Sequence, residues 1–240
     1  MKMTVLITLG LLTLPMAGYA GQAAKGGERF EITSLKMARP PLVNAVATLQ
    51  KKDAAGAKAA REAYDSVWNG VEVYVNVRSM DFYNELEHNH QAKLTEGLNA
   101  ASPDVPAMLA EAQAMLTKYD EMLATFAKAP PLNRLYDDVA RLRLERAHLR
   151  EVTPALKAGN LVKARTSFGA FNDNWDNIED LVKERSIQAY TGIEKGMIAI
   201  EGALMPAKPD VDQLITMVGD VMTQYNTIVA QVTKEAREAK

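Results

Sequence analysis

Polar and apolar positions along the chain follow a helical period, and no segment has the alternation of β-branched residues that is typical of a strand. Breaks rich in Pro, Gly and Asp separate the periodic segments. One helix is expected to follow Pro40-Pro41 and another to follow Pro130-Pro131, because proline is tolerated at a helix start. The pattern predicts further helices over about 54–98, 106–127, 161–204 and from 211 into the C-terminal tail.

The same pattern occurs twice. Trp68 and Trp175 lie 107 positions apart, and this offset also aligns an Arg-Ser pair, a Tyr and two Glu. The aligned pairs are Glu72 with Glu179, Arg78 with Arg185, Ser79 with Ser186, Tyr83 with Tyr190, and Glu87 with Glu194. We interpret the chain as an internal duplication, because chance does not keep such residues in register.

The predicted fold is therefore all-α, a long-helix bundle built from two tandem pseudo-symmetric three-helix repeats. Repeat one spans about 30–128 and repeat two about 129–237. The turn sequences "KKDAAG" and "KAGN" end the first helix of each repeat, with Asp53 and Asn160 as candidate N-caps of the next. We expect one packed bundle, because no long flexible linker divides the repeats; two separate domains are the alternative.

The repeated polar residues share one face of each predicted long helix. At about 100° per residue, Ser79, Tyr83 and His90 fall within roughly 40° of Glu72, as does Trp68, and Glu87 lies about 60° away. A solvated face has no reason to repeat Trp and Tyr, and a core face has no reason to repeat two Glu. We expect this polar stripe to be partly buried, so that its carboxylates need an arginine, a tyrosine hydroxyl or a metal ion as partner.

Two interpretations of the polar stripe are open. In the first, Arg78 and Arg185 pair with the glutamates in a structural network. In the second, Glu87-x-x-His90 places a carboxylate and an imidazole one helical turn apart, as in carboxylate-bridged metal bundles. Iron is then the first candidate and copper the second, because Met197 takes the place of His90 in repeat two. The predicted metal ligands are Glu72, Glu87, His90, Glu179 and Glu194.

Composition narrows the classes of function. The 240 residues carry a net charge of −2, so no global charge excess indicates nucleic acid binding. The absence of Cys excludes disulfides, thiolate metal sites and Cys nucleophiles. No phosphate-binding loop, nucleophile elbow or Ser/His/Asp arrangement is present, and we expect a protein that is not an enzyme. The basic segment 141–150, "RLRLERAHLR", is expected to be a solvated face, with a partner-binding face as the alternative.

The first twenty residues have the features of a signal peptide. Lys2 precedes an apolar run over about 5–14, and Gly18 and Ala20 suit cleavage before Gly21. Cleavage would place the mature chain in a bacterial periplasm, and an uncleaved membrane anchor is the alternative. No segment after Ala20 is apolar enough to cross a bilayer, so the mature chain is expected to have no transmembrane segment.

The segment "FNDNWDNIEDLVKERSIQAYTGIEKGMIAIEGAL", residues 171–204, resembles the helical periplasmic extension of bacterial high-affinity iron permeases. The chain resembles imelysin-type iron-uptake lipoproteins more distantly. The resemblance implies periplasmic iron handling, beside a membrane iron permease or another uptake component, with the four stripe glutamates as the acidic positions. The chain lacks the permease's transmembrane helices and Arg-Glu-x-x-Glu motif, so it cannot be the transporter. A helical scaffold or sensor that binds a partner protein or a small organic ligand is the alternative, with the polar stripe purely structural.

Mass spectrometry of periplasmic protein should find Gly21 as the N-terminal residue, because the cleavage site follows Ala20. A mature chain that keeps Met1 would mean that the segment is an anchor.

Overall fold

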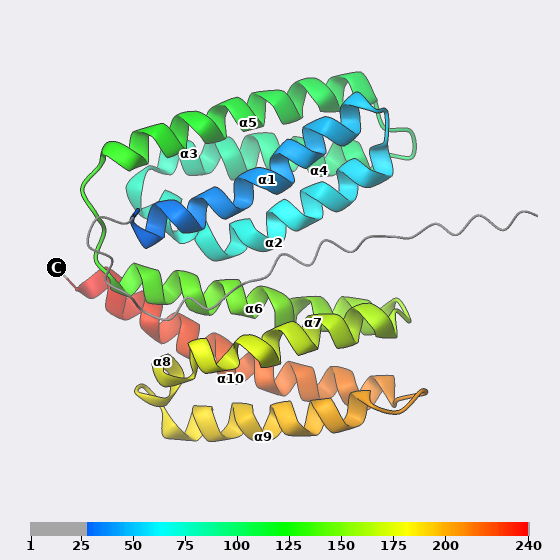
Figure 1. The fold of residues 1–240 in the computed structure, drawn as a ribbon, viewed down its shortest axis with the longest axis vertical. Coiled ribbons are helices and arrows are strands. Elements are labelled where there is room, and N and C mark those ends of the chain that lie inside the picture. Colours follow the sequence, from blue (N-terminus) through cyan, green and yellow to red (C-terminus); the bar gives the residue numbers. More distant parts are fainter. Residues whose placement is uncertain (1–27, 240) are drawn as a thin grey trace, which may run out of the picture.

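The computed structural model describes residues 28–239, which form helices and no strand (Figure 1). The prediction of an all-α bundle is confirmed for this part of the chain, while the predicted signal peptide lies outside it. None of the described helices is both long and apolar enough to span a membrane. The first half contains α1 (Phe30–Gln50), α2 (Ala54–Arg78), α3 (Met80–Tyr83), the π-helix η1 (Asn84–Gln91), α4 (Ala92–Asn99) and α5 (Val105–Lys128). The second contains α6 (Leu135–Lys157), α7 (Leu161–Asn174), the 3-10 helix η2 (Trp175–Asn177), α8 (Glu179–Lys183), α9 (Ile187–Leu204) and α10 (Val211–Glu238).

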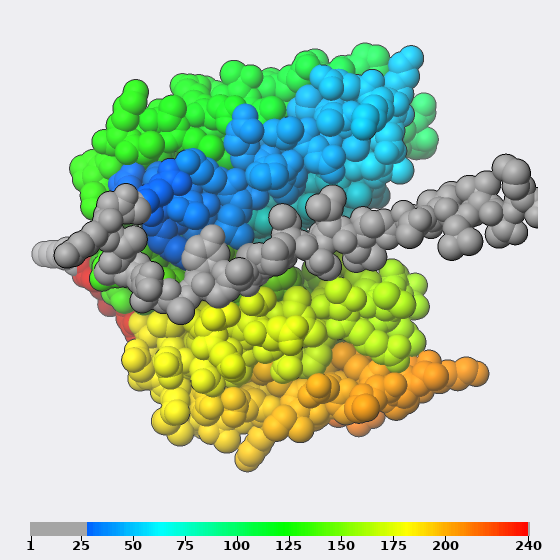
Figure 2. Space-filling view, in the orientation of Figure 1, coloured from blue at the N-terminus to red at the C-terminus, as the bar shows by residue number. Residues whose placement is uncertain are grey.

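The two halves form two bundles that lie side by side (Figure 1). In the first, α1 packs against α2 and α5, and η1 and α4 complete the bundle against α5. In the second, α6 packs against α7 and α10, and α9 packs against α10. The contact between α2 and α6 joins the bundles. On the face in Figure 2 they form two lobes, one blue to green and one yellow to orange.

Each predicted long helix is divided, so the prediction of one uninterrupted helix over 54–98 and over 161–204 was wrong. Both long helices break at a serine with extended backbone, Ser79 in the first half and Ser186 in the second (φ −159° and −160°). In the second half the helix is already interrupted after Asn174 by the 3-10 helix η2, so the short helix α8 lies between two breaks. Each serine hydroxyl accepts a hydrogen bond from a backbone N–H three residues later and so caps the next helix. A serine N-cap needs neither Pro nor Gly, and the sequence therefore carries no strong break signal.

The chain reverses direction at these breaks. After Ser79, Gln91 donates a hydrogen bond to Asp65 of α2 over 2.7 Å. In the second half the guanidinium of Arg165, at the start of α7, donates to the carbonyl of Leu204 at the end of α9 over 2.9 Å. These contacts make the two parts of each predicted long helix antiparallel neighbours. Each half thus has four helical arms, where three were predicted, and one hydrophobic core runs through both halves.

The first helix begins before Pro40-Pro41, whereas the sequence predicted that it follows them. Helix α1 starts at Phe30 and contains Pro40 and Pro41, whereas Pro130-Pro131 precede α6 as expected. Proline inside a helix costs about 3 kcal/mol because it removes a hydrogen bond and crowds the preceding turn. Burial of Ile32 and Leu35 ahead of the prolines offsets this, at roughly 1.5–3 kcal/mol for each buried side chain.

Each half encloses a buried aromatic cluster. Trp68 stacks on Tyr64, with ring centroids 5.7 Å apart, and Tyr119 meets both rings edge-on. In the second half, Trp175 packs on Phe171 at a tilt of 44°, and Tyr225 meets Phe171 edge-on. Such contacts add about 0.5–1.5 kcal/mol each beyond the burial of apolar area. The clusters fix both Trp side chains, whose indole N–H groups then point to a neighbouring helix.

The predicted turns are present at equivalent places. Asp53 caps α2 by accepting from the Gly56 N–H, and Asn160 caps α7 by accepting from the Lys163 N–H. The residue before each cap is left-handed, Lys52 with φ 60° and Gly159 with φ 69°.

Two Gly→Ala substitutions should change stability in opposite directions. Gly159→Ala forces a Cβ into left-handed backbone and should lower the free energy of unfolding by about 1 kcal/mol. Gly219→Ala, on an exposed part of α10, should raise it by about 0.5–1 kcal/mol, because alanine is the better helix former. A Cβ meets no atom within 4 Å at either position, so backbone conformation alone separates them. Chemical denaturation followed by circular dichroism measures the free energy of unfolding of both variants. If both substitutions raise it, or both lower it, the prediction is wrong.

Candidate functional site

A tryptophan–glutamate hydrogen bond recurs in the two halves. The indole N–H of Trp68 donates to Glu87 Oε2 over 2.5 Å, from α2 to η1. The indole N–H of Trp175 donates to Glu194 Oε1 over 3.2 Å, from η2 to α9. Both Trp side chains are buried, at 1% and 3% exposure. Each carboxylate is therefore held by a rigid neutral donor on the antiparallel neighbour.

In the second half, Tyr190 connects two carboxylates. Its hydroxyl donates to Glu179 Oε2 over 3.3 Å, and its ring stacks on Trp175 with centroids 6.3 Å apart. Hydrogen bonding to Glu194, with the nearby charge of Glu179, raises the pKa of Tyr190 to about 12. Glu179, Tyr190 and Glu194 thus place their oxygens together beside the buried indole. We call these three residues the second-half acidic site.

The equivalent residues of the first half are also close together. Burial raises the pKa of Glu72, and the charge of Glu87 raises it further. Burial raises the pKa of Tyr83, to which both glutamates add. Burial likewise raises the pKa of Glu87, against the stabilising hydrogen bond from Trp68. We call Glu72, Tyr83 and Glu87 the first-half acidic site.

One cation distinguishes the two acidic sites. Arg143 of α6 donates to Glu72 Oε1 over 3.2 Å, so the second half supplies a positive charge to the first. Within residues 28–239, Glu87, Glu179 and Glu194 make no ion pair. This role of Arg143 is not apparent from the sequence, where the basic segment 141–150 was expected to be a solvated face. The only available signal was the basic character of that segment.

His90 does not join either acidic site. Its Nδ1 lies 2.6 Å from Glu111 Oε1 on α5, whereas Glu87 faces Trp68 on α2. The expected spacing of one turn between Glu87 and His90 assumed an α-helix. Residues 84–91 instead form a π-helix, whose i→i+5 hydrogen bonds widen the turn and rotate the two side chains apart.

The structure does not gather the four glutamates into one site. They were expected to meet across two facing long helices, but the break in each helix keeps each pair within its own half. Across the described part of the chain, no three His, Asp or Glu side chains are grouped so that they could hold a metal ion. The five predicted ligands are therefore divided between the two acidic sites and the His90–Glu111 pair.

The repeated arginines have a structural role and do not neutralise the polar stripe. Arg78 forms a buried ion pair with Glu31 at the start of α1 and also donates to the carbonyl of Pro130. Arg185 donates to Glu235 of α10 over 2.9 Å. The expectation that these arginines pair with the stripe glutamates was wrong, because the break at the following serine turns them toward other helices.

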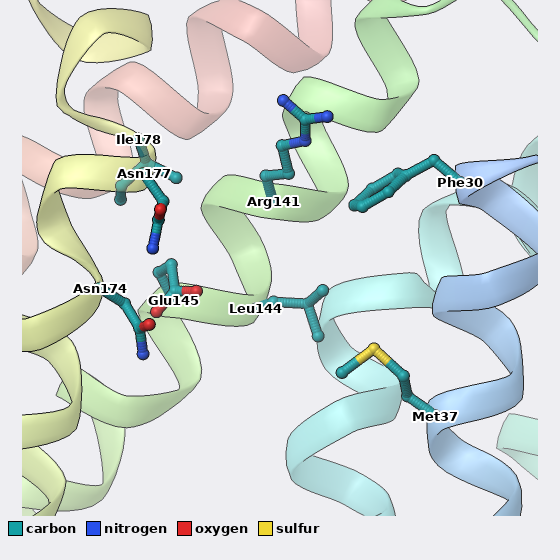
Figure 3. Close-up of a pocket in the computed structure, with 8 residues that line it drawn as sticks. All are labelled: Phe30, Met37, Arg141, Leu144, Glu145, Asn174, Asn177 and Ile178. Carbon is teal, nitrogen blue, oxygen red and sulfur yellow. The ribbon is translucent and has the colours of Figure 1, made fainter. Parts of the chain in front are cut away.

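A small cavity of about 50 Å³ lies between the halves, and Glu145 of α6 forms part of its wall (Figure 3). Asn174 and Asn177 lie beside Glu145, and Phe30 and Met37 of α1 lie on the opposite side, beyond Leu144. The Glu145 side chain is 10% exposed, and its Oε2 is buried without a hydrogen-bond partner. Burial raises the pKa of Glu145 to about 7.

No protein-family model, curated protein or solved structure matches this chain.

Replacement of Glu145 should change the pH dependence of stability. The folded protein keeps this carboxyl protonated up to about pH 7, whereas the unfolded chain ionises it near pH 4.5. The Glu145 carboxyl binds more protons in the folded state in this window, so its own contribution to the free energy of unfolding falls as pH rises through it, by at most about 3 kcal/mol. Glu145→Gln should remove that decrease in urea denaturation between pH 4.5 and 8. Glu184→Gln, whose side chain is 74% exposed, is the control, and equal profiles for both variants would contradict the prediction.

Proposed function

We propose that this is an exported, non-enzymatic helical protein that binds or delivers a metal ion, with iron as the first candidate and copper as the second. In this proposal it acts in the periplasm beside a membrane permease or another uptake component. The partner and the location follow from the sequence resemblance and from the predicted signal peptide. The proposal for the metal has a separate basis in the two acidic sites.

One observation carries the metal proposal: the same two glutamates, tyrosine and tryptophan recur in both halves, and among residues 28–239 their four carboxylates make one ion pair, Arg143–Glu72. Lys183 Nζ lies 5.2 Å from the ring centroid of Tyr190 but makes no ion pair with either glutamate of the second-half acidic site. In the first-half acidic site, burial and the nearby charge of Glu87 raise the pKa of Glu72, and a bound cation would remove that cost. The indole N–H orients a carboxylate without neutralising it. A structural network would be expected to pair these glutamates with arginine, as Glu31 is paired with Arg78.

The second-half acidic site is the better candidate for a cation site, because its carboxylates make no ion pair among residues 28–239. Glu179, Tyr190 and Glu194 offer two carboxylates and a phenol oxygen, which are hard ligands suited to iron. A bound cation would favour the phenolate form of Tyr190, reversing the effect of the neighbouring carboxylates on its pKa. Glu72 of the first-half acidic site already has Arg143, so we expect that site to bind a cation more weakly.

A second candidate function is a scaffold or sensor that binds a small organic ligand. Its basis is the cavity at Glu145, where a buried carboxyl oxygen without a hydrogen-bond partner, 4.0 Å from His148 Nε2, lies beside two Asn, Arg141 and apolar side chains. At about 50 Å³ the cavity is smaller than typical small-molecule sites, so a ligand would require the lining side chains to move apart. In that case the acidic sites would be structural hydrogen-bond networks.

Calorimetric titration of the metal-free protein with ferrous, ferric, cupric and zinc ions tests the metal proposal. The double substitution Glu179→Gln with Glu194→Gln keeps the shape of both side chains but removes their charge, and should weaken iron binding at least about tenfold. Glu72→Gln with Glu87→Gln should weaken it less, because Arg143 already compensates Glu72. Tyr190→Phe should abolish the visible tyrosinate-to-iron absorption that ferric iron is expected to produce.

Glu201→Gln is the matched control, since Glu201 is an exposed carboxylate of the same helix, α9, and has no ion pair among the described residues. It should leave the affinity unchanged. If the wild type binds none of these ions more tightly than the Glu179/Glu194 variant, the acidic sites are structural networks and the second candidate gains support.

A further inference from the structure

Arginines of α6 and basic side chains of α10 line an open cleft of about 550 Å³. Arg143 and Arg146 are half-buried on α6, and Lys234 and Arg237 are exposed on α10. We call these four residues the basic cleft. Asn226 and Thr233 add polar groups to its wall, and its volume is within the range of small-molecule sites, about 300–1,000 Å³.

Positive charge in the basic cleft is incompletely balanced. Arg143 pairs with Glu72, and Lys234 lies 3.9 Å from Glu238, the one carboxylate that lines the cleft. Arg146 bonds only to the neutral amide of Asn226, over 3.0 Å, and Arg237 makes no ion pair among residues 28–239. A protein surface normally intersperses both signs of charge, so four cations around one hollow indicate an anionic partner.

The pKa values of the two half-buried arginines reflect the same excess of positive charge. Burial lowers the pKa of Arg143, and the charge of Arg237 lowers it further. Burial also lowers the pKa of Arg146, with added repulsion from Arg143 and Arg150. The Nε–H groups of Arg143 and Arg146 are buried without a hydrogen-bond partner. Buried donors of this kind are normally completed by an ordered water or a bound ion.

We propose that the basic cleft binds a small multivalent oxyanion, either a phosphate or a polycarboxylate. Guanidinium groups donate parallel hydrogen bonds to two oxygens of one such anion, which ammonium groups cannot do with the same geometry. The half-buried Arg143 and Arg146 would hold the anion, and the exposed Lys234 and Arg237 would close over it. The basic cleft shares no residue with the second-half acidic site and adjoins the first-half acidic site through the Arg143–Glu72 ion pair, and it requires no metal ion.

The test is calorimetric titration of the chelator-treated protein in 0.15 M NaCl, where diffuse attraction is screened. Inorganic phosphate is one probe, and tricarballylate, a tricarboxylate without a chelating hydroxyl group, is the other. At least one should bind with millimolar affinity or tighter, and the comparison decides which class of anion the cleft takes. Arg146→Gln and Arg237→Gln should each weaken binding about tenfold, the loss expected for one charge-assisted hydrogen bond.

Arg150→Gln is the matched control, because Arg150 is an exposed residue of α6 that does not line the basic cleft. It should change the affinity less than about twofold. Arg237 is exposed, so its variant keeps the test valid even if Arg146→Gln fails to fold. The proposal is overturned if neither anion binds, or if Arg150→Gln weakens binding as much as Arg237→Gln. Binding only to phosphatidylglycerol vesicles, with no binding of either free anion, would also overturn it.

Discussion

Ser79 and Ser186 hold extended backbone between two helices, and both acidic sites depend on this reversal of the chain. In one continuous helix, Trp68 and Glu87 would lie about 28 Å apart along the axis, at 1.5 Å per residue. The reversal brings them within one hydrogen bond. Each serine hydroxyl caps the new helix, and the preceding arginine anchors the end of the old one. The repeated Arg-Ser pair therefore stabilises the chain reversal that brings the two parts of the polar stripe together.

The reversal leaves partly buried carboxylates facing indole N–H groups. A neutral donor orients a carboxylate and partly offsets its lost hydration, but it does not supply the charge that an ion pair would. The raised pKa values of Glu72 and Glu87 express this cost directly. The buried aromatic clusters supply the rigidity that holds the indoles in place. Charge at these sites is thus left in excess within a well-packed fold.

Helix α6 supplies charged side chains to both the cavity and the basic cleft, because it packs against α2, α7 and α10. Its residues three and four positions apart share a face. Arg141 and Glu145 line the cavity between the halves, and Arg143 and Arg146 line the basic cleft toward α10. Arg143 also reaches Glu72, so one side chain touches both the basic cleft and the first-half acidic site.

The sequence by itself determined the helical class, the repeated polar positions and the caps at Asp53 and Asn160, because these depend on local periodicity and on short-range hydrogen bonds. Only the tertiary structure decided which polar groups meet. The breaks at Ser79 and Ser186 and the π-helix at 84–91 each rotate or reverse the chain without any Pro or Gly to signal it. The pairing of His90 with Glu111 and of Glu72 with Arg143 follows from packing between distant segments, which helical spacing within one segment cannot specify.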